Sequence, residues 1–274
     1  MKKVSPEESR EIQLALVGYI DKICRENNIN YSLSAGSLLG AVKYQGYIPW
    51  DDDIDIMLTR PNYEKLMALL SADLPKNFSL NYYKLTDSFL PMAKLYDNRT
   101  LTKSNLDILH PDVGIFIDIF PVDSLPADKK EGERFKKKVR REVTRLTASK
   151  EGIGYASSER LLFAAAKSIL WLPSHLRYRH KTRAQAEKVD ALMQTYNDTN
   201  APYCNYVFSP PKQIAYFAKE DYAHYEDVAF EHLTLQKIVA HDTFLTTLYG
   251  DWRNPPKRER NHSYYHWYWK EDEA

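Results

Sequence analysis

Two aspartates one residue apart, Asp53 and Asp55, alternate with Ile54 and Ile56 in the sequence. Strict alternation predicts a β-strand, running to Leu58, in which side chains point to opposite faces in turn. Asp53 and Asp55 then share one face, where their negative charges repel each other unless a cation or a proton intervenes. The motif indicates a site for a hard metal ion, although on its own a solvated surface strand explains it better.

Two further segments contain residue types that suit the same chemistry. Gly36 and Ser37 lie at a predicted strand-to-helix turn, where exposed backbone amides and a hydroxyl can hold a phosphate. Asp118 lies inside the otherwise apolar strand pattern 114–120, and burying an unpartnered charge is costly. A metal ion shared with the first two aspartates would supply the missing partner, and a hydrogen bond to a backbone amide is the alternative.

The elements that must position these residues follow from caps, periodicity and turn residues. Ser5 and Glu8 have the spacing of a capping box, with Pro6 at the first helical position, so a helix begins there. The remaining pattern predicts strands at 31–35, 53–58, 78–85, 92–96, 113–120 and 233–235, and helices at 38–42, 61–70, 128–150, 159–197 and 242–249. We expect Pro121 to close the strand before it, and Gly152, Gly154 and Pro173 to interrupt the long helical region.

These elements predict an α/β fold of the α+β kind, with a mixed sheet and helices. The chain has 274 residues, which exceeds the usual size of a single domain. We expect a catalytic core at 1–126, a basic helical subdomain at 127–200, and a C-terminal segment at 201–274 that completes the catalytic lobe.

Charge is distributed unevenly along the chain. The formal net charge is +1, yet residues 129–188 contain 17 Lys/Arg against 6 Asp/Glu. Within this basic region the apolar run 161–172, which includes Phe163 and Trp171, is too short to span a bilayer. It is typical of an interfacial helix on an anionic membrane. An ordinary helical subdomain, whose apolar face packs on the catalytic lobe, explains it equally well.

Cysteine content and the N-terminal residues predict a location. Cys24 and Cys204 are the two cysteines of the chain, which gives neither a disulfide framework nor a zinc motif. No apolar stretch of the kind found in secretory signals follows the first residues. We therefore expect a cytoplasmic protein.

Three blocks of the sequence resemble one known family. The segments 34–42 (SAGSLLGAV) and 46–55 (GYIPWDDDID) closely resemble the signature of the LicD family of phosphocholine transferases. Residues 114–123 (GIFIDIFPVD) look like the second block of that family, and residues 248–252 (LYGDW) look like its C-terminal block. The resemblance covers about residues 30–255.

The resemblance implies a nucleotidyltransferase-type fold and a reaction. Gly36, Ser37 and the carboxylates of Asp53, Asp55 and Asp118 would position a nucleotide diphosphate with magnesium, as two ions. LicD-like enzymes move phosphocholine from CDP-choline to a hydroxyl of a bacterial cell-surface glycan precursor, of the teichoic acid or lipopolysaccharide type, and release CMP. The expected partners are thus CDP-choline or a similar nucleotide donor and a lipid-linked glycan acceptor, with peripheral contact to the inner face of the membrane.

The roles of several nearby residues are less determined. Lys94 has a position similar to a basic residue between the acidic blocks of the family, and we expect it to contact phosphate; a solvated strand lysine is the equal alternative. Asp51 and Asp52 either support the metal ligands or begin the strand, and we favour support for Asp52. Aromatic faces bind a choline cation well. The candidates are Tyr44, Tyr47, Trp50, Tyr264, Tyr265, Trp267, Tyr268 and Trp269.

Two alternatives to phosphocholine transfer stay open. The same fold could transfer another phospho-alcohol or a nucleotidyl group. A non-catalytic module that binds membrane or nucleic acid through the basic region is a different class of protein. The intact acidic set argues against such a module, and no nucleic-acid reading element is recognisable, so we expect no nucleic-acid partner.

Overall fold

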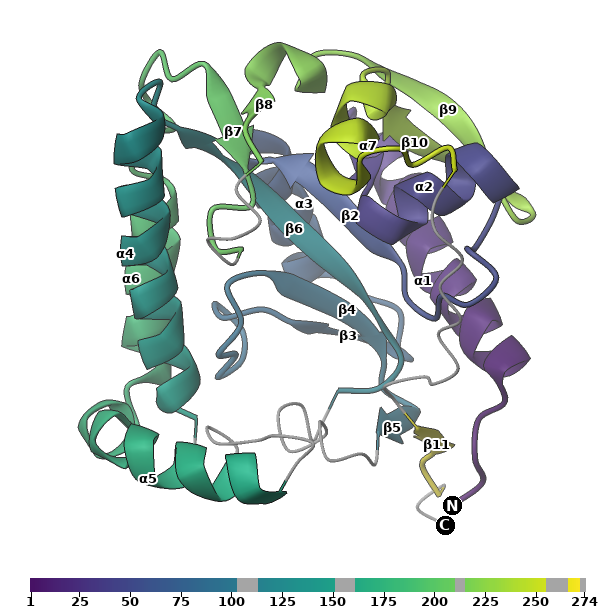
Figure 1. Cartoon of the computed structure of the whole chain (residues 1–274). Coiled ribbons are helices and arrows are strands. Elements are labelled where there is room, and N and C mark those ends of the chain that lie inside the picture. The colour runs from purple at the N-terminus through teal and green to yellow at the C-terminus, as the bar shows by residue number, and fades with distance from the viewer. Residues whose placement is uncertain (103–112, 151–160, 210–214, 255–265, 272–274) are drawn as a thin grey trace.

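The computed structural model describes residues 1–102, 113–150, 161–209, 215–254 and 266–271 (Figure 1). Its helices are α1 (Pro6–Glu26), α2 (Ala35–Tyr44), α3 (Arg60–Ala72), α4 (Lys129–Ala148), α5 (Leu161–Tyr178), α6 (Thr182–Met193) and α7 (His241–Tyr249), with a 3-10 helix, η4 (Lys219–Tyr222). Its strands are β1 (Ser32–Leu33), β2 (Asp55–Thr59), β3 (Phe78–Asn81), β4 (Ala93–Asp97), β5 (Thr100–Thr102), β6 (Phe116–Leu125), β7 (Tyr203–Asn205), β8 (Phe217–Ala218), β9 (Tyr225–Phe230), β10 (Leu233–Ile238) and β11 (Trp267–Trp269).

A mixed sheet of seven strands lies at the centre of the described residues. Its order is β1-β2-β6-β4-β3, and β7 joins β6 and β8 beyond the end of β4. β2 and β6 are parallel, whereas β4 pairs antiparallel with both β6 and β3. The prediction of a mixed sheet with helices is therefore confirmed. β6 pairs with β2 and β4 along its first part and with the C-terminal strand β7 at its end.

The first helix forms as its sequence predicts. The Ser5 side chain accepts a hydrogen bond from the Glu8 amide, and the Glu8 carboxylate accepts one from the Ser5 amide. One stripe of α1 is buried against the rest of the core, namely Ile12, Leu16, Val17, Ile20 and Cys24. Both α1 and α3 contact β6, while α4 and α6 pack together at the side of the sheet (Figure 1). These helices fix the two central strands.

Several predicted strand limits were wrong: the strand expected at 78–85 ends at Asn81, and the one expected at 113–120 begins at Phe116. Two further limits differ for reasons that involve distant parts of the chain. β2 begins at Asp55 rather than Asp53, because the Asp55 amide donates to the Ser37 hydroxyl at 2.9 Å. β6 continues through Pro121 to Leu125. Pro121 lies between the part of β6 that pairs with β4 and the part that pairs with β7, so its missing N–H removes no bond from those ladders.

The predicted helical region contains three helices. Pro173 lies inside α5 instead of ending it, and the break comes later, near His180, whose φ is 64°. Gly152 and Gly154 lie outside the described residues. Among the described residues, no helix has both the length and the apolar character needed to cross a membrane.

The C-terminal segment has the predicted strand and helix. The strand expected at 233–235 is β10, which pairs with β9 in a hairpin that contacts α1 and β1. The expected helix is α7, and it ends at Gly250, whose φ is 70°. Because α7 contacts α2, the C-terminal segment lies against the helix that carries Gly36 and Ser37.

Candidate active site

Three neighbouring strands bring two predicted carboxylates and Lys94 into one row. The registers place Asp118 of β6 opposite Asp55 on one side and opposite Lys94 on the other. The Lys94 Nζ atom donates to Asp118 Oδ1 at 2.5 Å and lies 3.4 Å from the centre of the Phe116 ring. Lys94 is buried. Asp118 therefore has a charged partner within the protein, which the sequence did not reveal.

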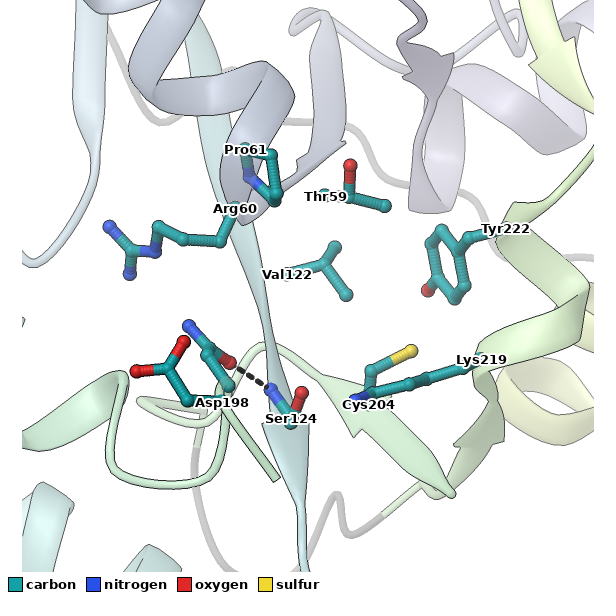
Figure 2. Close-up of a pocket in the computed structure, with 10 residues that line it drawn as sticks. Thr59, Arg60, Pro61, Val122, Ser124, Asp198, Cys204, Lys219 and Tyr222 are labelled. Atoms are coloured by element: carbon teal, nitrogen blue, oxygen red, sulfur yellow. Dashed lines mark hydrogen bonds between the residues drawn. The ribbon is translucent and has the colours of Figure 1, made fainter. Parts of the chain in front are cut away.

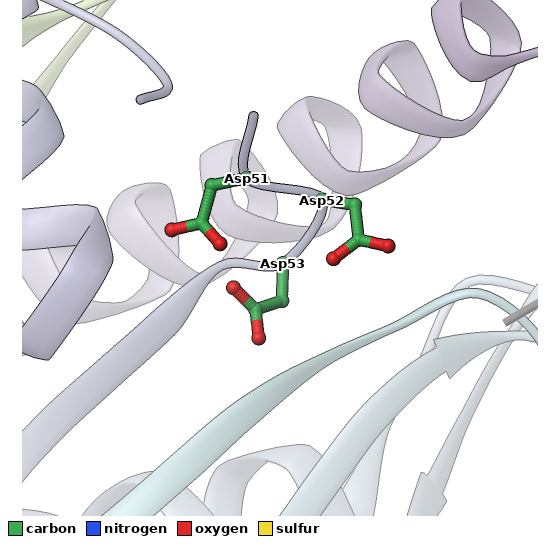
Figure 3. A group of neighbouring side chains, drawn as sticks. All are labelled: Asp51, Asp52 and Asp53. Atoms are coloured by element: carbon green, nitrogen blue, oxygen red, sulfur yellow. The ribbon is translucent and has the colours of Figure 1, made fainter. Parts of the chain in front are cut away.

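A second group of carboxylates lies just before β2. Asp51, Asp52 and Asp53 each present one carboxylate oxygen such that the three oxygens lie within 4.8 Å of one another (Figure 3). Their backbone is held by α1: Arg10 donates to the Asp51 carbonyl at 3.2 Å, and Gln13 to the Asp52 carbonyl at 2.8 Å. Asp51 thus belongs to the carboxylate group itself, which its position before the predicted strand did not establish. The roles of Arg10 and Gln13 were not predicted from the sequence.

The carboxylates influence one another electrostatically. Burial, followed by the charges of Asp51, Asp52 and Asp118, raises the pKa of Asp53 to about 7. Burial also raises the pKa of Asp55 well above its ordinary value, and the charges of Asp53 and Asp118 add to the effect. We call these five residues the acidic site. Asp53, Asp55 and Asp118 lie near enough for their charges to act on one another. Among the described residues, the carboxylates whose oxygens meet within 4.8 Å are Asp51, Asp52 and Asp53, so a metal site made of Asp53, Asp55 and Asp118 stays a prediction.

A divalent cation suits the acidic site. Mg²⁺ takes oxygen ligands, and carboxylates are its usual protein donors. Lys94 offsets one of the negative charges of the acidic site. The other carboxylates of this partly buried site then carry negative charge beyond what that ion pair neutralises. The donor set and the crowding of charge both fit a hard ion, with Asp53, Asp55 and Asp118 available together with Asp51.

The predicted Gly-Ser turn lies against this site, in the first turn of α2. A Cβ atom at Gly36 would lie 2.5 Å from Asp51 Oδ2, so no side chain fits there without displacing the carboxylate. Ser37 is buried, and its hydroxyl accepts the Asp55 amide hydrogen bond. Both residues therefore shape the acidic site. Their predicted contact with phosphate stays a prediction, as does that of Lys94.

Tyr206 is a further neighbour that sequence reasoning missed. Its hydroxyl contacts the Ser34 hydroxyl and lies 3.0 Å from Met57 Sδ. Burial raises its pKa, and the charge of Asp55 adds to this. Tyr206 is distant in sequence from all three partners, so no local motif could indicate it.

The aromatic candidates for a choline contact fall into three groups. Tyr47 is buried, and its hydroxyl donates to Gln13 at 3.0 Å. Tyr44 and Trp50 are each 37% exposed. Trp50 directly precedes Asp51, whereas Tyr44 lies at the other end of α2 from Gly36. The C-terminal candidates Trp267, Tyr268 and Trp269 form β11, which pairs with β5, and Tyr264 and Tyr265 lie outside the described residues.

A separate cavity of about 390 Å³ lies at the other end of β2 and β6 (Figure 2). It is lined by Thr59, Arg60, Pro61, Val122, Ser124, Asn197, Asp198, Cys204, Lys219 and Tyr222. The Arg60 guanidinium binds Asp123 through two bonds, at 2.8 and 2.5 Å, and Asp190 at 2.8 Å. Because the strands separate this cavity from Asp55 and Asp118, it is not part of the acidic site.

Comparison with known proteins identifies the region that contains this site. Residues 28–145 match the family model described as LicD/FKTN/FKRP, nucleotidyltransferase domain. The chain is 28% identical over 263 residues to the lipopolysaccharide cholinephosphotransferase LicD of Haemophilus influenzae, covering 94% of this chain and 95% of that protein. An uncharacterized protein of Rickettsia prowazekii is 36% identical over 61 residues, 22% of this chain and 23% of that protein. One of Rickettsia typhi is 54% identical over 35 residues, 13% of this chain and 11% of that protein.

Proposed function

The chain belongs to the LicD family and is a transferase, and on that premise we propose that it transfers phosphocholine from CDP-choline to a hydroxyl of a bacterial cell-surface glycan precursor. One observation supports this proposal most: Asp53, Asp55 and Asp118 converge beside the Gly-Ser turn, inside the matched domain. The relative of similar length is named for action on lipopolysaccharide, which favours a lipid-linked acceptor. A teichoic-acid precursor is the other acceptor of this class.

In the proposed reaction the acceptor oxygen attacks the phosphorus that bears choline. The bond from that phosphorus to the bridging oxygen breaks, CMP leaves with the oxygen, and the acceptor hydroxyl gives its proton to a carboxylate of the acidic site or to water. Magnesium, when bound, neutralises the diphosphate charge that develops on the leaving group. Asp53, Asp55 and Asp118 would hold it. Asp51 and Asp52 lie near enough to take part, because one oxygen of each lies within 4.8 Å of an Asp53 oxygen.

The other residues of the site position these carboxylates and the donor. Ser37 fixes the start of β2, because its hydroxyl binds the Asp55 amide. Lys94 orients Asp118 through their ion pair, and its charge lies where it can also favour a donor phosphate. Tyr44 and Trp50 offer exposed rings that suit a quaternary ammonium group. We propose that the enzyme works in the cytoplasm, at the inner face of the membrane.

A panel of nucleotide donors tests this proposal. Purified protein is incubated with CDP-choline and Mg²⁺, with and without a lipid-linked glycan, and CMP is measured; CDP-ethanolamine and CDP-glycerol are the comparison donors. We expect CMP release to be fastest with CDP-choline and to stop when EDTA removes the metal. A preference for another donor would support the alternative, transfer of a different phospho-alcohol by the same site. No CMP from any donor would contradict the proposal.

A further inference from the structure

Helix α5 (Leu161–Tyr178) has large apolar side chains on its solvent side. Leu162 is 87% exposed, Ile169 and Leu170 are each 75% exposed, and Leu176 and Leu172 are 52% and 43% exposed. Elsewhere in the described chain, exposed large hydrophobic residues occur singly or in pairs. Exposed apolar residues are ordinary when scattered, but a cluster of this size on one element marks an interaction surface.

The exposed residues lie on one side of the helix. Leu162, Ile169 and Leu176 are seven residues apart, so they form a ridge about 21 Å long along the helix axis. Since an α-helix turns about 100° per residue, Leu172 and Leu170 lie on either side of this ridge. We call these five residues the α5 ridge.

The opposite side of α5 carries polar side chains around the half-buried ring of Trp171. Lys167, Ser168, Ser174 and His175 are all half-buried, and His175 Nδ1 lies 2.9 Å from the Ala148 carbonyl oxygen of α4. An ordinary amphipathic helix of a globular protein buries its apolar side. In α5 most of the large apolar side chains face solvent instead, so the alternative in which the apolar face of this run packs on the catalytic lobe does not hold for α5. Figure 1 shows the helix crossing the end of α4, away from the central sheet.

Positive charge accompanies the α5 ridge. Residues 161–186 contain five Lys/Arg and no Asp/Glu. Arg177, Arg179 and Lys181, at the end of α5 and just after it, are all exposed. In α4, Lys136 is buried and donates to the Ser209 hydroxyl at 3.1 Å, so it adds no charge to the surface. The C-terminal end of the ridge is therefore cationic.

We propose that the α5 ridge is the surface by which this protein docks on an anionic lipid bilayer. A convex apolar ridge offers no groove for a peptide, whereas a bilayer requires no matching shape. The neighbouring cations complement anionic headgroups, each contributing to attraction at the surface. α5 lies in the interfacial plane with its ridge in the acyl boundary, as amphipathic helices of peripheral proteins do.

This inference deepens the proposed function but does not depend on it. If the acceptor is lipid-linked, docking through α5 keeps the enzyme where the acceptor is presented. Docking can also be measured without donor or acceptor, so its failure would leave the activity with CDP-choline untouched.

The first test is sedimentation of the full chain with vesicles at low salt. We expect wild type to sediment with vesicles of mixed phosphatidylglycerol and phosphatidylcholine, poorly with phosphatidylcholine alone, and less as salt is added. The double variant Ile169→Gln/Leu170→Gln should bind about tenfold or more weakly, because two exposed apolar anchors are lost. The control Leu85→Gln/Val239→Gln changes two exposed apolar side chains elsewhere, 50% and 48% exposed, and should bind as wild type does.

A matched pair of triple variants tests the charge. The first is Arg177→Gln/Arg179→Gln/Lys181→Gln, and the second is Lys22→Gln/Lys65→Gln/Lys76→Gln, which removes three exposed lysines from other parts of the chain. The first should weaken vesicle binding by about tenfold, and the second should change it little, because attraction falls off within a Debye length of the surface.

A fluorescent label gives the position of α5 directly. Cys24 and Cys204 are buried, so a cysteine introduced at position 169 is the accessible thiol among the described residues. We expect an environment-sensitive dye at 169 to shift to the blue on vesicle addition and to be quenched by lipid-phase quenchers, unlike the same dye at position 85. A dye at 169 that stays in water, or wild type that does not bind anionic vesicles, would overturn the proposal. So would a dimer that Ile169→Gln/Leu170→Gln converts to a monomer by light scattering, because the ridge would then join two copies.

Discussion

Replacing Asp53 with Asn should stabilise the metal-free protein while it abolishes turnover. Burial and neighbouring aspartates raise the pKa of Asp53 from 3.8 to about 7. Each pKa unit corresponds to about 1.4 kcal/mol, so charging Asp53 costs at most about 4 kcal/mol near pH 8. Partial exposure reduces this to about 2 kcal/mol. The neutral amide keeps the shape of the side chain and removes the cost, which should raise the melting temperature by a few degrees.

The sign of the pH dependence follows from the same shift. Between its unfolded and folded pKa values, the folded protein holds the Asp53 proton and the unfolded chain does not, so wild-type stability falls as pH rises from about 4 to about 7. The Asp53→Asn variant lacks this contribution. The stability of the variant relative to wild type should therefore be raised only slightly near pH 5 and most near pH 8.

The assay is thermal unfolding in EDTA and in Mg²⁺, with CMP release measured on the same preparations. Mg²⁺ should stabilise wild type, because an ion that binds only the folded state shifts the equilibrium toward it, and should stabilise the variant less. Asp87→Asn, the same change at an exposed loop residue, should alter neither property. A variant that is less stable than wild type in EDTA at pH 8, or that gains as much from Mg²⁺, would refute the reasoning.

Three other substitutions have expected outcomes. Gly36→Val should weaken nucleotide binding by calorimetry far more than it lowers the melting temperature, because its Cβ would displace the Asp51 carboxylate; equal losses would make Gly36 purely structural. Arg60→Met should cost about 3–5 kcal/mol in urea unfolding, because it leaves the buried Asp123 charge unpaired; a loss below about 1 kcal/mol would contradict this. Lys136→Met should stabilise the protein at pH 7, because burial lowers the pKa of Lys136 to about 8. The stability that Lys136→Met gains over wild type should shrink as pH rises from about 8 to about 10.5. In that range wild-type folded protein has lost the Lys136 proton, whereas the unfolded chain still holds it. A gain in stability that does not change with pH would contradict the reasoning.

Local signals in the sequence predicted local structure well. The capping box at Ser5 and Glu8 gave the start of α1, because both of its hydrogen bonds lie within four residues. Gly250 likewise marked the end of α7. The convergence of Asp55 and Asp118 was predictable in kind, because each carboxylate lies in a strand pattern where charge needs a partner.

Contacts between distant segments explain what the sequence did not show. The start of β2 depends on a hydrogen bond from Asp55 to Ser37, which alternation cannot encode. The partner of Asp118 is Lys94, which becomes visible only when β4 and β6 pair in register. The composition of α5 indicated a helix with an apolar side, but whether that side meets the core or the solvent depends on how α5 packs on α4.

The direction of bond cleavage tests the central claim most directly. CDP-choline is incubated with the enzyme and Mg²⁺ in ¹⁸O-water without acceptor, so that water takes the place of the glycan hydroxyl, and both products are weighed by mass spectrometry. Transfer of phosphocholine requires attack at the phosphorus that bears choline, and the account predicts ¹⁸O in phosphocholine and none in CMP. Label in CMP would show attack at the nucleoside phosphorus, and the enzyme would then be a nucleotidyl transferase rather than a phosphocholine transferase.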